Sequence, residues 1–263
     1  MTAAVMDIVS LFSPISLEEM DSVKLMNRID TKFVIPSWQL PAILQQALAE
    51  YRVQDIDGVR IATYDTLYYD TLSLDMYMRH HDRQLVRQKI RIRQYVESDL
   101  TFLEIKRKNN KGRTRKKRII VPDFHPEGVV ECTGKEYQTV ADFVAAKSIY
   151  SWSELTPALR TVFHRITLVN SAKTERLTID ADLLWENQRS SGRFIFPDLV
   201  IIELKRDGNM LSPMLRIMRQ AHIHPFKVSK YCLGTALTTP LLKQNRFKRK
   251  VRMIQKILNN NNQ

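Results

Sequence analysis

Alternating charged and apolar residues mark several segments of the chain as β-strands. The clearest is 87–93, where cations alternate with glutamine and isoleucine. A strand sends successive side chains to opposite faces, so the cations of this segment share one face. A hydrophobic core does not accept four unpaired cations, and this face must therefore meet water or an anion. The four cations are Arg87, Lys89, Arg91 and Arg93.

The same two-faced pattern recurs in segments 28–35, 102–106, 116–121, 164–168, 176–180 and 200–205. One face of each segment is apolar, and the other is dominated by Lys and Arg with single acids beside them. A half-solvated antiparallel sheet would produce the same pattern strand by strand. The whole set favours a closed barrel with a cationic lumen, because closure also removes exposed strand edges. Such a lumen repels itself, and it predicts a polyanionic ligand.

The remaining pattern predicts a single α+β domain over residues 1–263, because no linker or repeat divides the chain. Strands are expected at 28–35, 62–71, 74–80, 85–96, 100–108, 113–121, 158–170, 174–184 and 193–206, with a hairpin turn at 109–112. Helices are expected at 3–27 with a break at Pro14, and at 38–51, 136–150, 212–222, 228–237 and 240–258. Ser16 with Glu19, and Ser212 with Pro213, have the spacing of helix starts.

The net charge of +13 indicates an acidic partner such as nucleic acid, polyphosphate, a nucleotide or an anionic membrane. Residues 240–263 hold seven cations and no acid, so the remainder carries 34 cations against 28 acids, or +6. The apolar stripe of the predicted helix 240–258 favours packing on the body of the protein. An anionic membrane surface or an acidic partner is the alternative. The stripe consists of Phe247, Val251, Ile254 and Leu258.

The cysteines and the N-terminal residues indicate the compartment. Cys132 and Cys232 form neither a metal-ligand spacing nor a disulfide framework, which fits a reducing cytoplasm. Residues 1–7 lack the basic region of a signal peptide, and no apolar run reaches 18 residues. We therefore expect a cytoplasmic protein, or one bound peripherally at the inner face of the membrane through its basic C-terminal helix.

Short motifs follow one another in a specific order from about residue 24 to 236. They include NRIDTKF at 27–33, YYDT at 68–71, KIRIRQY at 89–95, LEIK at 103–106, RKKR at 115–118, RTVFHR at 160–165, ERLTID at 175–180, IELK at 202–205 and FKVSKY at 226–231. In this order the chain resembles the VTC domain, the polyphosphate polymerase domain of the triphosphate tunnel metalloenzyme (CYTH-like) superfamily. The resemblance implies an eight-stranded antiparallel β tunnel flanked by helices, with a core at about 24–236.

The resemblance also implies roles for individual residues. The residues expected to act in catalysis are Arg91, Arg93, Lys106, Lys205 and Lys227. Those expected to bind substrate are Lys32, His80, Lys89, Lys116, Arg118, Arg165, Arg176 and Lys230. Glu203 is the expected ligand of a Mn²⁺ or Mg²⁺ ion, since both metals accept oxygen ligands and keep part of their hydration.

The implied activity is transfer of the γ-phosphoryl group of ATP to a growing polyphosphate chain. ATP and polyphosphate are then the partners, with a membrane protein that exports the polymer as a further one. Two alternatives stay open: an inorganic triphosphatase in the same tunnel, and a non-catalytic polyanion-binding protein. The wider superfamily begins with Glu-x-Glu-x-Lys, whereas this chain has Arg28-x-Asp30-x-Lys32, which weakens the triphosphatase alternative. Few aromatic residues lie on the charged faces, so no specific nucleic acid is expected.

Several residues also have simpler interpretations. Glu104 and Asp180 are expected to pair with neighbouring cations rather than to bind a metal. His222 and His224 are expected to flank a helix end, and Tyr68 and Tyr69 to pack in the core. For His80, an ordinary surface position is as consistent with the sequence as a place in the tunnel.

Overall fold

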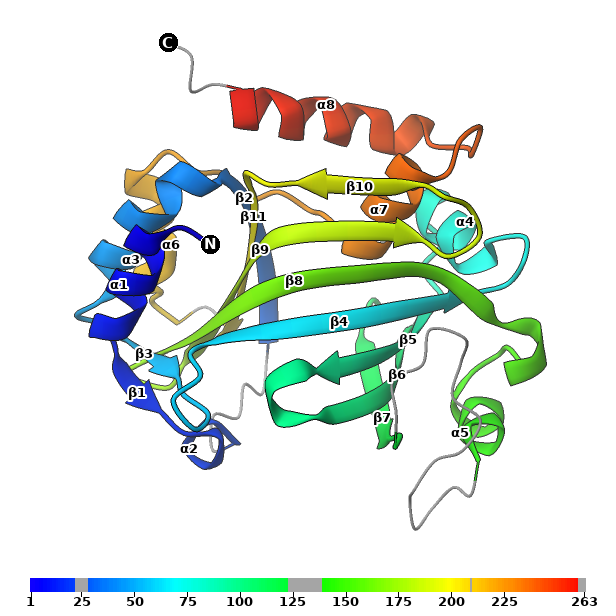
Figure 1. Cartoon of the computed structure of the whole chain (residues 1–263), viewed down its shortest axis with the longest axis horizontal. Helices are drawn as coiled ribbons and strands as arrows, with labels where there is room; N and C mark the ends of the chain where they lie inside the picture. Colours follow the sequence, from blue (N-terminus) through cyan, green and yellow to red (C-terminus); the bar gives the residue numbers. More distant parts are fainter. Residues whose placement is uncertain (22–27, 123–138, 209, 260–263) are drawn as a thin grey trace.

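One curved antiparallel sheet dominates the computed structural model, which describes residues 1–21, 28–122, 139–208 and 210–259 (Figure 1). Eight strands form its main hydrogen-bonded path, each antiparallel to the next. Their order is β2 (Arg28–Pro36), β11 (Leu199–Asp207), β9 (Glu175–Asn187), β8 (Thr156–Asn170), β4 (Ile61–Asp70), β5 (Arg87–Tyr95), β6 (Leu100–Lys108) and β7 (Thr114–Ile120). Three short strands extend the sheet: β1 (Ser13–Ile15), β3 (Tyr51–Gln54) and β10 (Arg193–Phe196).

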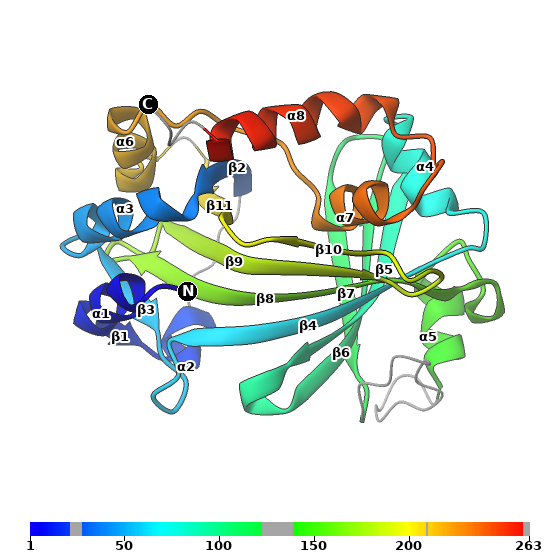
Figure 2. The same ribbon diagram turned by 45° about the horizontal axis from the view of Figure 1, so that its top comes forward.

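The predicted closed barrel is not confirmed. Among the described residues no pairing joins β7 to β2, and the sheet curls into a half-barrel instead (Figures 1 and 2). Both free edges carry cations that project toward the concave side, including Lys32 on β2 and Lys116 on β7.

Helices cover the convex face and one end of the half-barrel. Helices α1 (Ala3–Leu11), α3 (Leu40–Ala47) and α6 (Pro213–Gln220) pack on the apolar residues of β2, β8, β9 and β11. Helix α5 (Val140–Lys147) packs on β4, β5 and β6. Helices α4 (Asp75–His81) and α7 (Lys230–Thr238) lie at one end, and α8 (Asn245–Asn259) starts there and runs toward β2 (Figure 2). The short helices are α2 (Leu17–Asp21), η1 (Ser37–Gln39), η2 (Val96–Ser98) and η3 (Trp152–Glu154).

The alternation of the strands decides which face each side chain occupies. On β11, Val200, Ile202 and Leu204 are fully buried in the core under α1, α3 and α6. The intervening Glu203 and Lys205 lie on the concave face, where they line a cavity. Burial of one face against helices therefore fixes the register that presents the charged face to the inside of the half-barrel.

Three expected elements differ in the structure. The strand predicted at 74–80 is wrong, because these residues belong to helix α4. The strand predicted at 193–206 is divided into β10 and β11, with Pro197 and Asp198 between them. The helix predicted at 3–27 comprises α1, β1 and α2, and residues 22–27 lie outside the described residues, as do 136–138 of the helix predicted at 136–150.

Local start and turn signals are confirmed. Ser212 Oγ accepts the backbone N–H of Leu215 at 3.1 Å, and Ser16 Oγ accepts that of Glu19 at 3.2 Å. The hairpin between β6 and β7 closes through Asn109, whose backbone N–H donates to the carbonyl of Arg113 at 2.9 Å. Gly112 has φ of 77°, the left-handed region that such a turn requires.

The basic C-terminal helix packs on the body of the protein, as the favoured interpretation of its stripe expects. Phe247 and Ile254 are buried, and Val251 and Leu258 are partly buried, in one cluster with residues of α7. The cations of α8 lie on the remaining faces. Among the helices of the described residues, none is long and apolar enough to cross a membrane.

Candidate functional site

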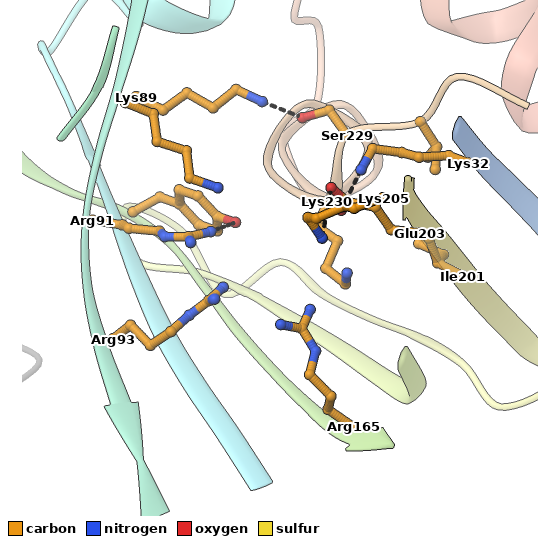
Figure 3. A pocket seen from close by; sticks show the side chains of 13 residues that line it. Lys32, Lys89, Arg91, Arg93, Arg165, Ile201, Glu203, Lys205, Ser229 and Lys230 are labelled. Carbon is orange, nitrogen blue, oxygen red and sulfur yellow. Dashed lines mark hydrogen bonds and ion pairs between the residues drawn. The ribbon is translucent and has the colours of Figure 1, made fainter. Parts of the chain in front are cut away.

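The concave face of the half-barrel holds a cavity of roughly 180 Å³ whose walls are strongly basic (Figure 3). Eight cations, one carboxylate and four other residues among the described part of the chain line it. The cations are Lys32, Lys89, Arg91, Arg93, Lys106, Arg165, Lys205 and Lys230, the carboxylate is Glu203, and the others are Tyr68, Ile201, Val228 and Ser229. A surface of this composition suits a ligand with several negative charges.

Strand register builds one wall of the cavity. Lys89 on β5 lies opposite Lys106 on β6, and Lys106 lies opposite Lys116 on β7. One row further along, Arg91 lies opposite Glu104. Opposite residues of paired strands project to the same side of the sheet, so the alternation within each strand becomes rows of cations across three strands.

The facing wall comes from β2 and β11, with contributions from β8 and α7. Lys32 lies opposite Glu203 across the β2–β11 pair, and the two side chains form an ion pair. Arg165 enters from β8, and Lys230 enters from the first turn of α7. Figure 3 shows these side chains pointing toward Lys89, Arg91 and Arg93 across the cavity.

Two buried carboxylates behind the walls hold four of the basic residues in place. Glu104 accepts from Arg91 at 2.5 Å and from Lys116 at 2.8 Å. Asp180 accepts from Arg165 at 2.5 Å and also from Lys230. The expectation that Glu104 and Asp180 pair with cations is confirmed. Burial alone would raise the pKa of each carboxyl, but the neighbouring cations outweigh it and hold both pKa values well below their usual range.

Three cations of the cavity have no carboxylate partner among the described residues: Lys89, Arg93 and Lys106. Arg93 donates from Nε to the hydroxyl of Thr66 at 3.0 Å and to no acid. Burial and the charge of Arg91 lower its pKa. The pKa of Lys106 lies well below its usual value, chiefly because of the charge of Arg91 and then because of burial. Arg93 and Lys106 contribute positive potential that a bound anion would offset.

The lysines near α7 and β11 are also perturbed. Burial lowers the pKa of Lys205 to about 8, although Glu203 at 3.1 Å favours the charged form. Burial likewise lowers the pKa of Lys230. Lys89 donates to the hydroxyl of Ser229 at 2.7 Å, a contact that links β5 to the N-cap of α7 across the cavity.

Glu203 is the residue that could hold a metal ion in this cavity. Burial opposes its ionised form, but the charges of Lys205 and Lys32 prevail and keep its pKa well below normal. Groups of three or more acidic, histidine or cysteine side chains suited to a metal do not occur among the described residues. Mg²⁺ is often bound through one or two carboxylates with water and substrate phosphates as the other ligands, so a single carboxylate fits an ion that binds together with phosphate.

Five residues predicted to contact substrate or to act in catalysis lie outside the set that lines this cavity. Lys116 is engaged with Glu104, and Arg118 lies 4.4 Å from the centroid of the Phe102 ring. Arg176 is on β9, opposite Lys205 of β11, and Lys227 lies before the start of α7. His80 lies in a second cavity together with residues of α8.

The structure adds residues that the sequence did not single out for this site. Tyr68 packs as expected, with its ring 5.0 Å from that of Tyr231, yet it also lines the cavity and accepts a hydrogen bond from Arg91 at 3.3 Å. Ser229 reaches the cavity as the N-cap of α7, and a serine directly before a helix is commonly an N-cap.

His222, which is not among the residues that line this cavity, follows α6 with φ of 55°, as expected for a residue that flanks a helix end.

Comparison with known proteins gives one family and several distant structural similarities. The family model of the VTC domain matches residues 27–239. No curated protein matches the chain.

Two solved structures illustrate the distant similarities. A putative adenylyl cyclase from Hippeastrum, described as revealing a dominant triphosphatase activity, is 14% identical with a TM-score of 0.47 over 82% of this chain and 99% of its own. A putative adenylate cyclase from Vibrio parahaemolyticus is 9% identical with a TM-score of 0.44 over 78% of this chain and 96% of its own.

Proposed function

The chain belongs to the VTC domain family, and from this membership we propose that it is a metal-dependent polyphosphate polymerase. Its substrates are ATP and inorganic polyphosphate, and its product is a polymer longer by one phosphate. The observation that carries the proposal is the cavity on the concave face, the central cavity, where eight cations and a single carboxylate of the described residues converge.

The chemistry suits a site that has positive charge but no dedicated base. A terminal phosphate oxygen of the polymer attacks the γ-phosphorus of ATP, and the bond from that phosphorus to the β–γ bridging oxygen breaks. ADP leaves with the electron pair of that bond. The attacking oxygen is already anionic near neutral pH, so no proton has to be removed first. The main obstacle is repulsion between two polyanions, and positioning with electrostatic stabilisation addresses it.

The ion-pair pattern divides the work among the cations. Arg91 and Arg165 are fixed by Glu104 and Asp180, so they are suited to orient phosphates through planar guanidinium groups. Arg93 and Lys106 are not bound to any carboxylate of the described residues, and they are suited to the transferred group, where negative charge is greatest. Lys32 and Lys205 share Glu203 and can turn to a phosphate when this carboxylate binds a cation.

Glu203 is the residue that we propose to hold Mn²⁺ or Mg²⁺, with phosphate oxygens as further ligands. When bound, the metal would neutralise part of the phosphate charge. The chain's own contribution is to present one ionised carboxylate between two lysines at the wall of the cavity.

The test is to incubate the full chain with ATP and Mn²⁺ or Mg²⁺ and to analyse the products. Long-chain polyphosphate and ADP are expected. Release of free phosphate without polymer would contradict the polymerase and favour a triphosphatase. Binding without turnover would favour a non-catalytic polyanion-binding protein.

Substitution of Glu203 gives the sharper measurement. Glu203→Ala is expected to reduce metal-dependent turnover by at least a hundredfold with little change in thermal stability. Glu186→Ala is the matched control, since Glu186 also lies on the sheet between two cations, Arg160 and Arg193, but outside the cavity. Unchanged turnover in Glu203→Ala would remove the metal assignment.

A further inference from the structure

A second basic cavity, of roughly 130 Å³, lies beside helices α4 and α8. The start of α8 lies near α4 in both views (Figures 1 and 2), and the ring of Phe247 lies 5.5 Å from that of Tyr77. Four cations and no carboxylate are among the described residues that line this cavity. The lining residues are His80, His81, Arg83, Arg87, Arg246, Phe247 and Lys250.

Three of the four cations of this cavity, Arg87, Arg246 and Lys250, are held by carbonyl groups and not by acids of the described residues. Arg87 donates to the carbonyl of Gln84 at 2.6 Å, and Lys250 donates to that of Lys227 at 2.7 Å. Arg246 donates to the carbonyl of His81 at 3.4 Å. In the described part of the chain none of the four cations forms an ion pair, whereas Lys243 at the start of the same helical region pairs with Asp82 at 3.3 Å. No ion pair of the described residues therefore neutralises these four charges, and the carboxylate of Asp82, which contacts the lining residue His81 at 2.8 Å, pairs with Lys243.

The positive charge lowers the pKa values of buried and half-buried groups around the cavity. Burial, together with the charges of Lys89, Arg87 and Lys250, lowers the pKa of His80 to about 3, so its ring is neutral near pH 7. The Nδ1 atom of His80 is buried and has no hydrogen-bond partner among the described residues. Burial also lowers the pKa of Lys250, and the charges of Arg83 and Lys227 act in the same direction.

We propose that this second cavity is a binding site for a phosphate group, distinct from the central cavity. Its two half-buried cations, Arg87 and Lys250, lie beside the exposed Arg83 and Arg246, whose guanidinium groups match tetrahedral oxyanions through paired N–H donors. A bound phosphate would offset the repulsion within this group. The site goes beyond the proposed polymerase and does not depend on it.

Two sources of the phosphate are compatible with this chemistry. Inorganic phosphate could bind there alone. A polyphosphate chain could also extend there from the central cavity, because Arg87 and Lys89 share one face of β5, about 7 Å apart along the strand. The experiment has an arm for each source.

Calorimetric titration of the full chain with inorganic phosphate and with long-chain polyphosphate separates them. The background is the double variant Arg93→Ala and Lys106→Ala, which weakens the central cavity. In this background protein, the further pair of changes Arg246→Gln and Lys250→Gln is expected to weaken binding of phosphate or polyphosphate at least tenfold. Arg252→Gln with Lys256→Gln is the matched control on α8, with the same change in charge at two exposed residues outside the cavity, and it should stay within about twofold.

The pattern of loss identifies the source and can overturn the proposal. Loss of inorganic phosphate binding supports a stand-alone site, and loss of polymer binding alone supports an extended track. The proposed site would be refuted if the variant pair at positions 246 and 250 and the control pair at positions 252 and 256 bound each ligand with equal affinity. As an independent readout, the NMR signals of the His80 ring should shift on phosphate addition in the otherwise unmodified chain and not in Arg246→Gln with Lys250→Gln, whose fold is checked by circular dichroism.

Discussion

At the scale of single residues, the cavity cations differ in whether a carboxylate holds them. Arg91 and Arg165 are anchored, and the anchoring carboxylates are themselves fully buried. A buried ion pair adds little net stability, because the loss of hydration offsets much of the attraction. Its consequence here is orientation: the guanidinium groups stay directed along the cavity wall when no ligand neutralises their charge.

Lys205 provides a prediction at this scale because its pKa of about 8 lies within an accessible range. Above pH 8 the folded protein loses this charge, so affinity for tripolyphosphate should fall as pH rises from 7 to 9.5. In Lys205→Arg the fall should move to higher pH, since arginine stays protonated. Titration of both proteins across this range provides the measurement, and identical pH profiles would contradict the role of Lys205.

Loss of the Lys205 charge as pH rises should lower ligand affinity but raise the free energy of unfolding. Between pH 8 and its ordinary pKa of 10.5, Lys205 binds fewer protons in the folded than in the unfolded state. The free energy of unfolding therefore gains a contribution that rises with pH through this window, as the penalty for a buried charge disappears. Urea unfolding at pH 7.5 and 9.5 should show this gain in the wild type relative to Lys205→Arg.

At the scale of elements, helix α7 decides how the cavity is completed. Its N-terminus supplies Ser229 and Lys230, and its middle packs on β9 through Gly234. An added Cβ at Gly234 would lie 2.1 Å from Cδ1 of Trp185, a side chain that is fully buried and donates from Nε1 to the carbonyl of Lys230 at 3.1 Å. The absence of a side chain at position 234 therefore sets the distance between α7 and the sheet.

Gly234→Ala is predicted to affect both stability and ligand binding. Overpacking against a rigid indole should lower the free energy of unfolding by about 1–3 kcal/mol. It should also displace Lys230 and weaken tripolyphosphate binding several-fold. Ala236→Gly is the control, because glycine in the same helix costs about 1 kcal/mol without pushing α7 away. Equal affinities in the two variants would show that the position of α7 does not govern binding.

The strands of the main path could be predicted because both of their faces are specified by sequence. Apolar residues such as Ile90 and Ile202 have to be buried, and cations such as Arg91 cannot be buried without a partner. Helix α4 could not be predicted in this way. Its start depends on Asp70, a residue of β4 whose carboxylate accepts the backbone N–H groups of Met76 and Tyr77 at 2.9 and 3.0 Å.

The error at α4 also explains why the position of His80 was open from the sequence. A strand would have sent His80 to one face of the sheet, whereas the helix brings it beside Phe247 of α8. The pairing of β11 with β2, and the open line between β7 and β2, likewise depend on contacts between segments far apart in the chain. Patterning within a segment carries no information about such contacts.

At the scale of the whole molecule, part of the positive charge is concentrated in two cavities. The chain has 41 cations and 28 acids, and the described residues that line the two cavities include twelve cations and one carboxylate. Net charge of this size opposes the compact state through self-repulsion. A polyanionic ligand relieves the repulsion, so binding and folding are coupled through charge.

This coupling predicts that salt has opposite effects on stability and on binding. Raising NaCl from 50 to 300 mM screens repulsion between charges more than about 10 Å apart, so the melting temperature of the ligand-free protein should rise. Over the same range the affinity for tripolyphosphate should fall. At 100 times the dissociation constant the ligand should add about 2.7 kcal/mol to the free energy of unfolding, or roughly 5–10 °C in melting temperature.

Thermal melts with and without tripolyphosphate at several salt concentrations test this prediction directly. Sucrose at matched osmolality is the control, because it favours the compact state through exclusion from the surface and leaves the charges unscreened. Sucrose should raise the melting temperature and preserve ligand affinity, whereas NaCl should raise the melting temperature and lower ligand affinity. A melting temperature of the ligand-free protein that falls with NaCl would show that favourable ion pairs, such as those of Glu104 and Asp180, outweigh repulsion among the cations.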